Sequence, residues 1–447
     1  MSIPNSSMGK RRAIFILLLI FLMCFLVLYP FRFLAQTESQ KNRLNLLLVT
    51  IDTLRTDRVS FYSQKHLKTP SMDSLASRSV VFARAFAHTS TTLPSHTNIL
   101  LGSTPSYHGV HDNANFVVRN DFLTLAEHLK SFGYSTGAFV GGFPLDSRFG
   151  LNQGFDIYDD NFGKAETNLQ EAAASGGERR AQAVLDSALK WLQEQKPPWF
   201  LWIHFFDPHD PYTPPEPFKT QYASTLYDGE VAYVDSIMRN LLRYLEENSL
   251  FAKTLIVFTG DHGESLGEHG ERTHGYLAYN TTIWTPFFIS FPGLEHKVIH
   301  QNVSHIDIFP TVCDILQIQK PAYLQGMSLA PFLKGKKIDE KPIYFESLSP
   351  YCNMGWAPIQ GYIDKQDKFI DSPLPELFDL EKDFDEGRNL AEHKKLDSYK
   401  KMLDKIILLQ SSEERLKAEQ KMDRETQRKL KSLGYLASLQ PSKKIAF

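Results

Sequence analysis

Four continuous runs of apolar residues stand out along the chain, and segments with apolar residues at helical spacing lie between them. The runs cover residues 44–51, 200–206, 254–260 and 286–291, and the helical segments include 179–195 and 228–247. A short unbroken apolar run is typical of a strand buried on both faces of a helix-covered parallel sheet. The alternation of the two patterns therefore predicts an α/β fold.

Polar side chains follow three of these runs directly. Asp52 follows the first, Asp207 and His209 follow the second, and Asp261 and His262 follow the third. In open α/β sheets, ligands bind beyond the carboxyl ends of the strands. We therefore expect these residues to converge on one site, although they are far apart in sequence.

The pattern changes after about residue 340. Shorter strand-like pieces, IYFES, QGYIDKQDKFI and ELFDL, predict a small antiparallel sheet, and a Lys/Glu-rich stretch with helical spacing follows. We predict four parts: an N-terminal membrane anchor or signal at 1–36, a catalytic domain at 44–340, a small sheet lobe at 341–390 and a charged helical tail at 391–447.

The N-terminus combines a basic cluster with an apolar stretch. Lys10, Arg11 and Arg12 precede apolar residues 13–29, and no small-residue cleavage site follows. We expect a single uncleaved membrane helix, with the basic residues on the cytoplasmic side and the rest of the chain on the periplasmic or external side. A cleaved secretory signal is the alternative.

Composition limits the classes of partner and ligand. The net charge of the 447 residues is −2, which provides no bulk field to attract nucleic acid, so we expect no nucleic-acid partner. The three cysteines, Cys24, Cys313 and Cys352, show no CxxC spacing. A metal ion would therefore need oxygen and imidazole ligands.

The glycine-rich segment TGDHGESLGEHGERTHG, residues 259–275, is the densest group of possible ligands. Its glycines allow tight turns that could bring several side chains to one point, although a charged surface loop is the simpler alternative. Two carboxylates and an imidazole, from Asp52, Asp261 and His262, suit zinc or manganese more than calcium, and magnesium stays open.

A hydroxyl-rich segment, HTSTTLPSHTN, leads through Pro94 into a helical pattern. Thr92 should therefore lie at or near a helix N-terminus, where backbone N–H groups and the helix dipole bind phosphate or sulfate. The alternative is that Thr91 or Thr92 only caps the helix.

Seven blocks along residues 44–390 resemble, in order, the sulfatase family of the alkaline phosphatase superfamily. They are LLLVTIDTLRTDRVSFY, TLPSHTNILLGSTPSYHGV, HFFDPHDPY, VFTGDHGESLGEHG, DIFPTVCDIL, LQGMSLAPFLKG and ELFDLEKDFDEGRNL. The resemblance implies an alkaline-phosphatase-like, mostly parallel sheet sandwiched by helices, with a small C-terminal antiparallel lobe and a helical tail.

The resemblance also implies roles for individual residues. Asp52, Asp261 and His262 would hold a divalent metal, and Thr92 would be both nucleophile and metal ligand. His209 and His274 would contact the ester or its leaving group, and His96, which replaces the family's arginine beside the nucleophile, joins the catalytic set.

Departures from the family pattern bear on the substrate. Sulfatases oxidise a Cys or Ser to an aldehyde, whereas Thr92 would give a ketone, which hydrates poorly. Thr53 replaces a second metal-binding Asp, and the family's G-K-W-H segment, whose Lys touches sulfate, is missing. The resemblance then favours the Thr-nucleophile branch of the superfamily and phosphate esters.

We therefore predict a metal-dependent hydrolase in which Thr92 attacks a phosphate or sulfate ester in line and water releases the covalent intermediate. The substrate would be a small-molecule, glycan or lipid ester. A true sulfatase and a phospho-head-group transferase are the alternatives. A second metal held by Asp207, His209, His269 and His274 also stays open. His204, inside an aromatic strand, is interpreted as a core residue.

Overall fold

The structure is a computed structural model that describes residues 43–162, 178–411, 426 and 429–430. The expected membrane anchor at 1–36 and most of the tail beyond 411 lie outside these residues. No helix within the described ranges is long and apolar enough to cross a membrane. The anchor and the extracytoplasmic location therefore stay predictions from the sequence.

Eight strands form the main sheet, in the order β4-β3-β5-β1-β6-β7-β2-β8. Neighbouring strands are parallel, except that β7 runs antiparallel to both β6 and β2. The strands are β1 (Asn45–Ile51), β2 (Val80–Phe86), β3 (Ser135–Val140), β4 (Ile157–Asp159), β5 (Trp199–Phe205), β6 (Thr254–Gly260), β7 (Trp284–Ser290) and β8 (Lys297–Ser304). The four apolar runs correspond to β1, β5, β6 and β7, and the predicted mostly parallel sheet is confirmed.

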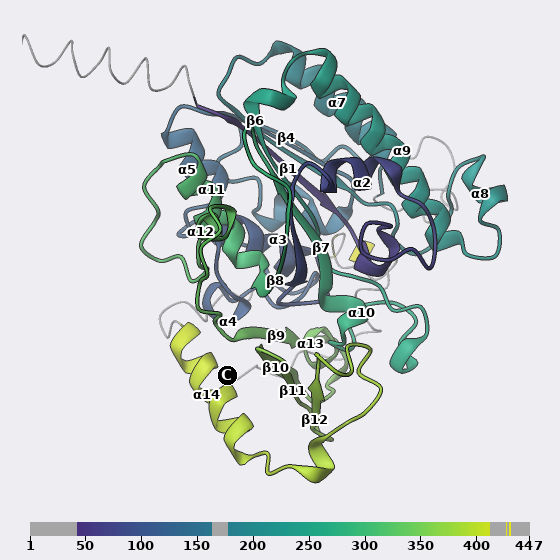
Figure 1. Cartoon of the computed structure of the whole chain (residues 1–447), viewed down its shortest axis with the longest axis vertical. Helices are drawn as coiled ribbons and strands as arrows, with labels where there is room; N and C mark the ends of the chain where they lie inside the picture. Colours follow the sequence, from purple (N-terminus) through teal and green to yellow (C-terminus); the bar gives the residue numbers. More distant parts are fainter. Residues whose placement is uncertain (1–42, 163–177, 412–425, 427–428, 431–447) are drawn as a thin grey trace, which may run out of the picture. The chain divides into compact units, whose positions relative to one another are not determined.

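Helices cover both faces of this sheet (Figure 1). One layer contains α2 (Pro70–Ala76), α7 (Ala181–Glu194) and α9 (Leu226–Glu247). The other contains α3 (Thr92–Leu101), α5 (Leu125–Ser131), α11 (Ile308–Ile315) and α12 (Ala330–Leu333). Short helices connect these elements: α4 (Pro105–His108), α8 (Phe218–Gln221), α10 (Asn280–Ile283) and α13 (Ser349–Met354).

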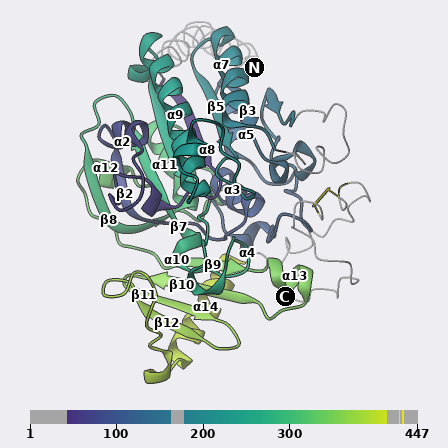
Figure 2. The same cartoon turned by 90° about the vertical axis from the view of Figure 1, so that its right-hand side faces the viewer.

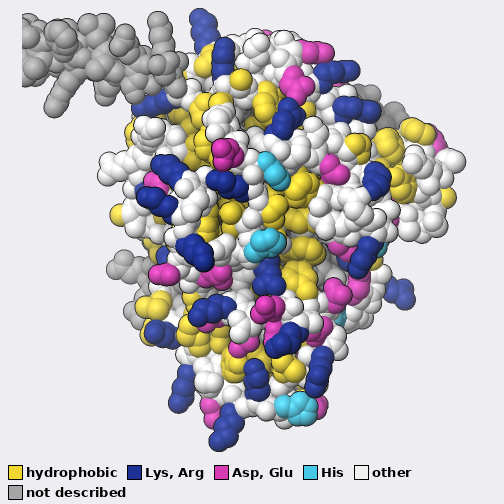
Figure 3. Space-filling view, in the orientation of Figure 1, with side chains coloured by type: hydrophobic (Ala, Val, Ile, Leu, Met, Phe, Trp, Pro, Cys, Tyr) yellow, Lys and Arg dark blue, Asp and Glu magenta, His cyan; other side chains and the backbone are white. Residues whose placement is uncertain are grey.

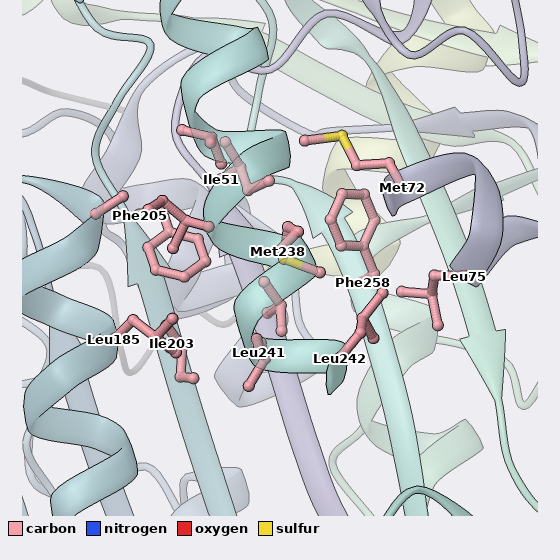
Figure 4. Packing of buried hydrophobic residues seen from close by; sticks show 14 of the residues in the cluster. Ile51, Met72, Leu75, Leu185, Ile203, Phe205, Met238, Leu241, Leu242 and Phe258 are labelled. Carbon is pink, nitrogen blue, oxygen red and sulfur yellow. The ribbon is translucent and has the colours of Figure 1, made fainter. Parts of the chain in front are cut away.

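Alternation along the central strands divides their side chains between the two layers. Ile51, Phe205 and Phe258 point into the apolar core under α2, α7 and α9 (Figure 4). The residues next to them, Thr50 and His204, therefore face the opposite layer, which contains α3. Because side chains alternate between the two faces of a strand, polar side chains of the sheet lie beside the helix that begins at Thr92.

A second sheet has four antiparallel strands, in the order β12-β11-β10-β9. They are β9 (Ile343–Ser347), β10 (Ile359–Asp364), β11 (Asp367–Asp371) and β12 (Glu376–Asp379), and α14 (Asp397–Gln410) packs against one face (Figure 2). The predicted small antiparallel sheet and the start of the helical tail are confirmed. The domain boundaries at 340 and 390 stay predictions.

The surface shows no segregation of charge on the face seen in Figure 3. Lys and Arg side chains alternate with Asp and Glu side chains over this face. This one face therefore shows no basic stripe of the kind that nucleic-acid binding uses.

Candidate functional site

Three buried polar atoms without hydrogen-bond partners meet at the carboxyl end of the central strands. They are Asp52 Oδ1, Asp261 Oδ2 and His262 Nε2, and all three residues are fully buried. Nε2 of His262 lies 3.7 Å from Asp52 Oδ1 and 3.5 Å from Asp261 Oδ2. Buried polar atoms are rarely left unpaired, so this arrangement fits a bound divalent cation.

Pairing of the strands explains why the two carboxylates meet. Ile51 at the end of β1 is in register with Gly260 at the end of β6, so Asp52 and Asp261 leave the sheet side by side. The Asp261 N–H donates to the Ile51 carbonyl over 3.2 Å, which holds the two strand ends together.

Hydrogen bonds from neighbouring groups orient each candidate ligand. Asp261 Oδ1 accepts from the backbone N–H of Thr53 at 3.1 Å and of His262 at 2.7 Å, so Oδ2 is left for a cation. The Nδ1–H of His262 donates to the Gly263 carbonyl at 2.9 Å, which leaves the Nε2 lone pair facing the carboxylates. The hydroxyl of Thr53, which stands where the resemblance expects a second Asp ligand, donates to the Pro208 carbonyl.

Burial strongly shifts the pKa values of two of the candidate ligands. Burial, together with the charge of Asp52, raises the pKa of Asp261 well above its usual value. Burial, and the neighbouring His274, lower the pKa of His262. A neutral imidazole and two carboxylates form a mixed nitrogen and oxygen set, for which zinc and manganese stay the predicted metals.

Thr92 is the first residue of α3, as predicted, and its side chain is fully buried. Its hydroxyl donates to Asp52 Oδ2 over 3.2 Å. The residue before it, Thr91, occupies the N-cap position without a side-chain capping bond. The hydroxyl of Thr92 therefore faces the candidate metal ligands and does not cap the helix.

His96 lies in the same cluster, with both ring nitrogens engaged. Nδ1–H donates to the Thr92 carbonyl at 2.8 Å, and Nε2 accepts from the Thr50 hydroxyl at 2.9 Å. Trp202 Nε1–H donates to that same hydroxyl at 3.0 Å. These bonds fix the first turn of α3 against the sheet, so the geometry favours a positioning role for His96 over proton transfer.

His209 and His274 lie together beside the cluster. The His274 ring is 4.6 Å from the His262 ring and 5.0 Å from the His209 ring. Its Nδ1 lies 3.1 Å from Oε1 of buried Glu264. Burial alone would lower the pKa of His274, but the nearby carboxylates Glu264, Asp52 and Glu271 together raise it above its usual value. Burial lowers the pKa of His209 to about 4.

His204 is interpreted from the sequence as a core residue; it is fully buried, and it also faces a candidate metal ligand. This buried residue of β5 is in register with Thr50, and its Nε2 lies 3.4 Å from Asp52 Oδ2. Its Nδ1 accepts from the Gly141 N–H at 3.4 Å, so Nε2 carries the proton and faces the carboxylate. His204 thus contacts Asp52, a candidate metal ligand, on the carboxylate oxygen that does not face His262. Its place one residue before the end of a central strand was the available signal.

Replacing His204 with leucine is expected to lower metal affinity by about 10- to 100-fold, because outer-shell partners orient the ligands that they contact. Chelator competition on the purified protein measures this. His128→Leu is the matched control, since that ring packs on Phe132 and Phe309 and bonds to the Gln319 carbonyl. Equal affinity in the His204 variant and the control would contradict the assignment.

The structure does not bring together the four residues considered for a second metal. Asp207 accepts from Arg180 at 2.7 Å and from the Ala181 N–H at 2.9 Å. His269 stacks on Tyr279 with ring centroids 3.7 Å apart. Within the described part of the chain, the candidate cation groups are Asp52, Asp261 and His262, and the overlapping trio His96, His204 and Asp261.

Known proteins resemble this chain over most of its length. The sulfatase family model matches residues 44–318, and the model for the C-terminal part of N-sulphoglucosamine sulphohydrolase matches 267–413. A choline-sulfatase of Rhizobium meliloti (strain 1021) is 25% identical over 431 residues, with 78% of this chain and 82% of the relative covered.

Solved structures show the same fold. The phosphonate monoester hydrolase of Agrobacterium radiobacter has a TM-score of 0.68 at 21% identity, covering 82% of this chain and 95% of its own. A 2-O GAG sulfatase has a TM-score of 0.68 at 21% identity, covering 86% of this chain and 96% of its own. These similarities confirm the predicted fold class.

Proposed function

We propose, on the premise that this chain belongs to the sulfatase family and is an ester-bond hydrolase, that it cleaves phosphate-type esters by attack of the Thr92 hydroxyl. The observation that carries the proposal is the position of this hydroxyl. It lies at the start of α3 and 3.2 Å from Asp52 Oδ2, beside the candidate metal ligands. A sulfate ester is the second candidate.

Asp52, Asp261 and His262 would hold one divalent cation. Their unpartnered, mutually close atoms are the observation that supports this fit. When bound, such a cation supplies positive charge that stabilises an alkoxide and the ester oxygens. The cation's identity is part of the proposal, with zinc or manganese expected.

The residues of the chain then divide the steps of an in-line displacement. Thr92 Oγ1 forms a bond to phosphorus while the bond to the leaving oxygen breaks, and Asp52 is the nearest acceptor for the hydroxyl proton. His209 and His274, which lie beside the cluster, protonate the leaving oxygen and later deprotonate the water that cleaves the covalent ester.

Two features favour phosphorus over sulfur. The nucleophile is a secondary alcohol, which cannot be oxidised to an aldehyde, so the plain hydroxyl must attack. The segment at 136–150 also contains no lysine, and its one basic residue, Arg148, pairs with Asp146. The relatives' names include choline-sulfatase and phosphonate monoester hydrolase, so both ester classes need testing.

A metal-replete screen across p-nitrophenyl sulfate, phosphate, phosphate diester and phosphonate substrates tests the choice. We expect kcat/KM for the best phosphorus ester to exceed that for the sulfate by at least about tenfold. Thr92→Ala, assayed in parallel, shows whether each activity comes from this site. A clear preference for the sulfate that disappears in Thr92→Ala would replace phosphate with sulfate as the substrate class.

A further inference from the structure

The strand β9 is the strand of the second sheet nearest to the main sheet (Figures 1 and 2). It lies at the edge of its sheet, so one side of its backbone has no strand beside it. The chain that leads into α3 occupies part of that side. The Glu346 N–H donates to the His88 carbonyl at 2.9 Å, and Thr89 forms a parallel bridge with Glu346. The second sheet therefore holds the backbone three residues before Thr92.

The side chain of Glu346 binds a second segment of the main domain. This carboxylate is fully buried, and the Nδ1–H of His111 donates to its Oε1 at 2.6 Å. The Tyr344 hydroxyl donates to Oε2 at 2.7 Å and accepts from Gln360 Nε2 at 2.7 Å. Both oxygens of Glu346 are thus bonded, and loss of His111 would leave a buried acceptor without its partner.

The loop that contains His111 returns to the first turn of α3. Two residues after His111, Asn113 Oδ1 accepts from the Leu93 N–H at 2.8 Å. Leu93 is the second residue of the helix and directly follows Thr92. Glu346 therefore holds the backbone on both sides of Thr92, before it by a main-chain bond and after it through His111 and its loop.

The start of α3 depends on such contacts because its own cap does not fix it. Thr91 occupies the N-cap position without a side-chain capping bond. The position of Thr92 is therefore determined by bonds to other parts of the chain. Bonds from the sheet side come from His96, and bonds from the side of the second sheet come from Glu346.

We propose that Glu346 and His111 are positioning residues that set the place of the Thr92 hydroxyl for attack. The inference rests on the proposed function and extends the catalytic machinery to the second sheet. The pair acts through the backbone around Thr92, not through contact with the ester. In-line attack needs the nucleophile within about 3–3.5 Å of the reacting atom, and a misplacement of about 1 Å can cost about 10²-fold in rate.

Two variants of His111 separate the hydrogen bond from the packing of the ring. His111→Leu removes the donor to Glu346 but keeps an apolar side chain. His111→Asn keeps an N–H donor, because its amide nitrogen and Nδ1 of histidine are both three bonds from Cα. His128→Leu is the matched control, since that ring bonds to the Gln319 carbonyl. For each variant, kcat, KM, metal content and thermal unfolding are measured, with assays well below the unfolding temperature.

We expect His111→Leu to lower kcat on the best phosphorus ester by about 10- to 100-fold, with KM within about threefold and metal content as in the wild type. His111→Asn should keep kcat within about threefold of the wild type, and His128→Leu should have wild-type kcat. A role in stability alone would lower the unfolding temperature of His111→Leu and leave its kcat unchanged.

Folded His111→Leu protein with wild-type kcat would overturn the inference, and equal losses in the Leu and Asn variants would overturn the role of the hydrogen bond. If His111→Leu fails to fold, Glu346→Asp decides. It keeps the carboxylate but shortens the side chain by one CH2 group, so we expect kcat to fall at least about fivefold, and wild-type kcat would overturn the inference.

Thr92→Ala, assayed in parallel, distinguishes failure of this inference from failure of the proposed function. If Thr92→Ala were active, the proposed function would fall, and the positioning role with it. If Thr92→Ala were inactive and His111→Leu fully active, only the positioning role would fall.

Discussion

Thr92→Ala is expected to lower kcat/KM by at least about 10⁴-fold, because removal of a nucleophile leaves only the residual catalysis of binding and charge stabilisation. The protein should stay folded, since the hydroxyl makes a single described hydrogen bond, to Asp52, and alanine is a better helix former than threonine. Thr92 is also a predicted metal ligand, but metal content should stay near that of the wild type, because Asp52, Asp261 and His262, the group whose ligand atoms lie close together, all remain.

Two matched variants make this result specific. Thr92→Ser keeps a hydroxyl at the same place, now a primary alcohol, and should retain measurable turnover. Thr91→Ala removes the neighbouring hydroxyl, which contacts Thr89 and caps nothing, and should keep kcat/KM within about threefold of the wild type. A metal-loaded Thr92→Ala protein with more than a tenth of wild-type turnover would exclude Thr92 as the nucleophile.

Asp261→Asn is expected to weaken metal binding by more than about 100-fold, beyond the effect typical of residues that stand behind the ligands. The amide can keep accepting from the backbone N–H groups of Thr53 and His262, so the local backbone should hold its shape. The substitution changes the group that faces Asp52 and His262. That group becomes either an uncharged amide oxygen or an NH2 group.

The same variant has an opposite effect on the stability of the metal-free protein. In the wild type without metal, two buried carboxylates face each other, and this repulsion helps to raise the pKa of Asp261. Asp261→Asn removes the repulsion, so it should unfold at a higher temperature than chelator-treated wild type. Metal at 100 times its wild-type Kd should stabilise the wild type by about 2.7 kcal/mol and the variant by no more than about 0.4 kcal/mol.

Thermal unfolding with and without chelator measures both effects. Asp235→Asn is the control for the loss of a buried carboxylate, because Asp235 accepts from the backbone N–H groups of Ser71 and Met72, away from the cluster. It should be less stable than the wild type but keep the full response to metal. An Asp261→Asn protein that metal stabilises as much as the wild type would place the cation elsewhere.

The parts of the site that follow strand ends could be predicted from the sequence. Asp52 and Asp261 each come directly after an apolar run, and strand pairing alone brings them together. The apolar run that became β7 was also found, but its direction was not, because a buried strand has the same composition in either direction. Strand order and direction depend on contacts between distant segments.

The role of His204 has only a weak signal in the sequence, its place one residue before the end of a central strand. His204 has aromatic neighbours in sequence, and its role depends on facing Asp52 across the sheet. Conversely, His269 and His274 belong to one ligand-rich loop, but only His274 turns toward the cluster.

One measurement tests the central claim most directly. The metal-loaded enzyme is mixed with a p-nitrophenyl phosphorus ester, quenched in acid during turnover, digested and analysed by peptide mass spectrometry. Attack by Thr92 predicts one phosphoryl group on the peptide that contains Thr92, and no such group in Thr92→Ala. A phosphoryl group on another residue, or one that persists in Thr92→Ala, would contradict it.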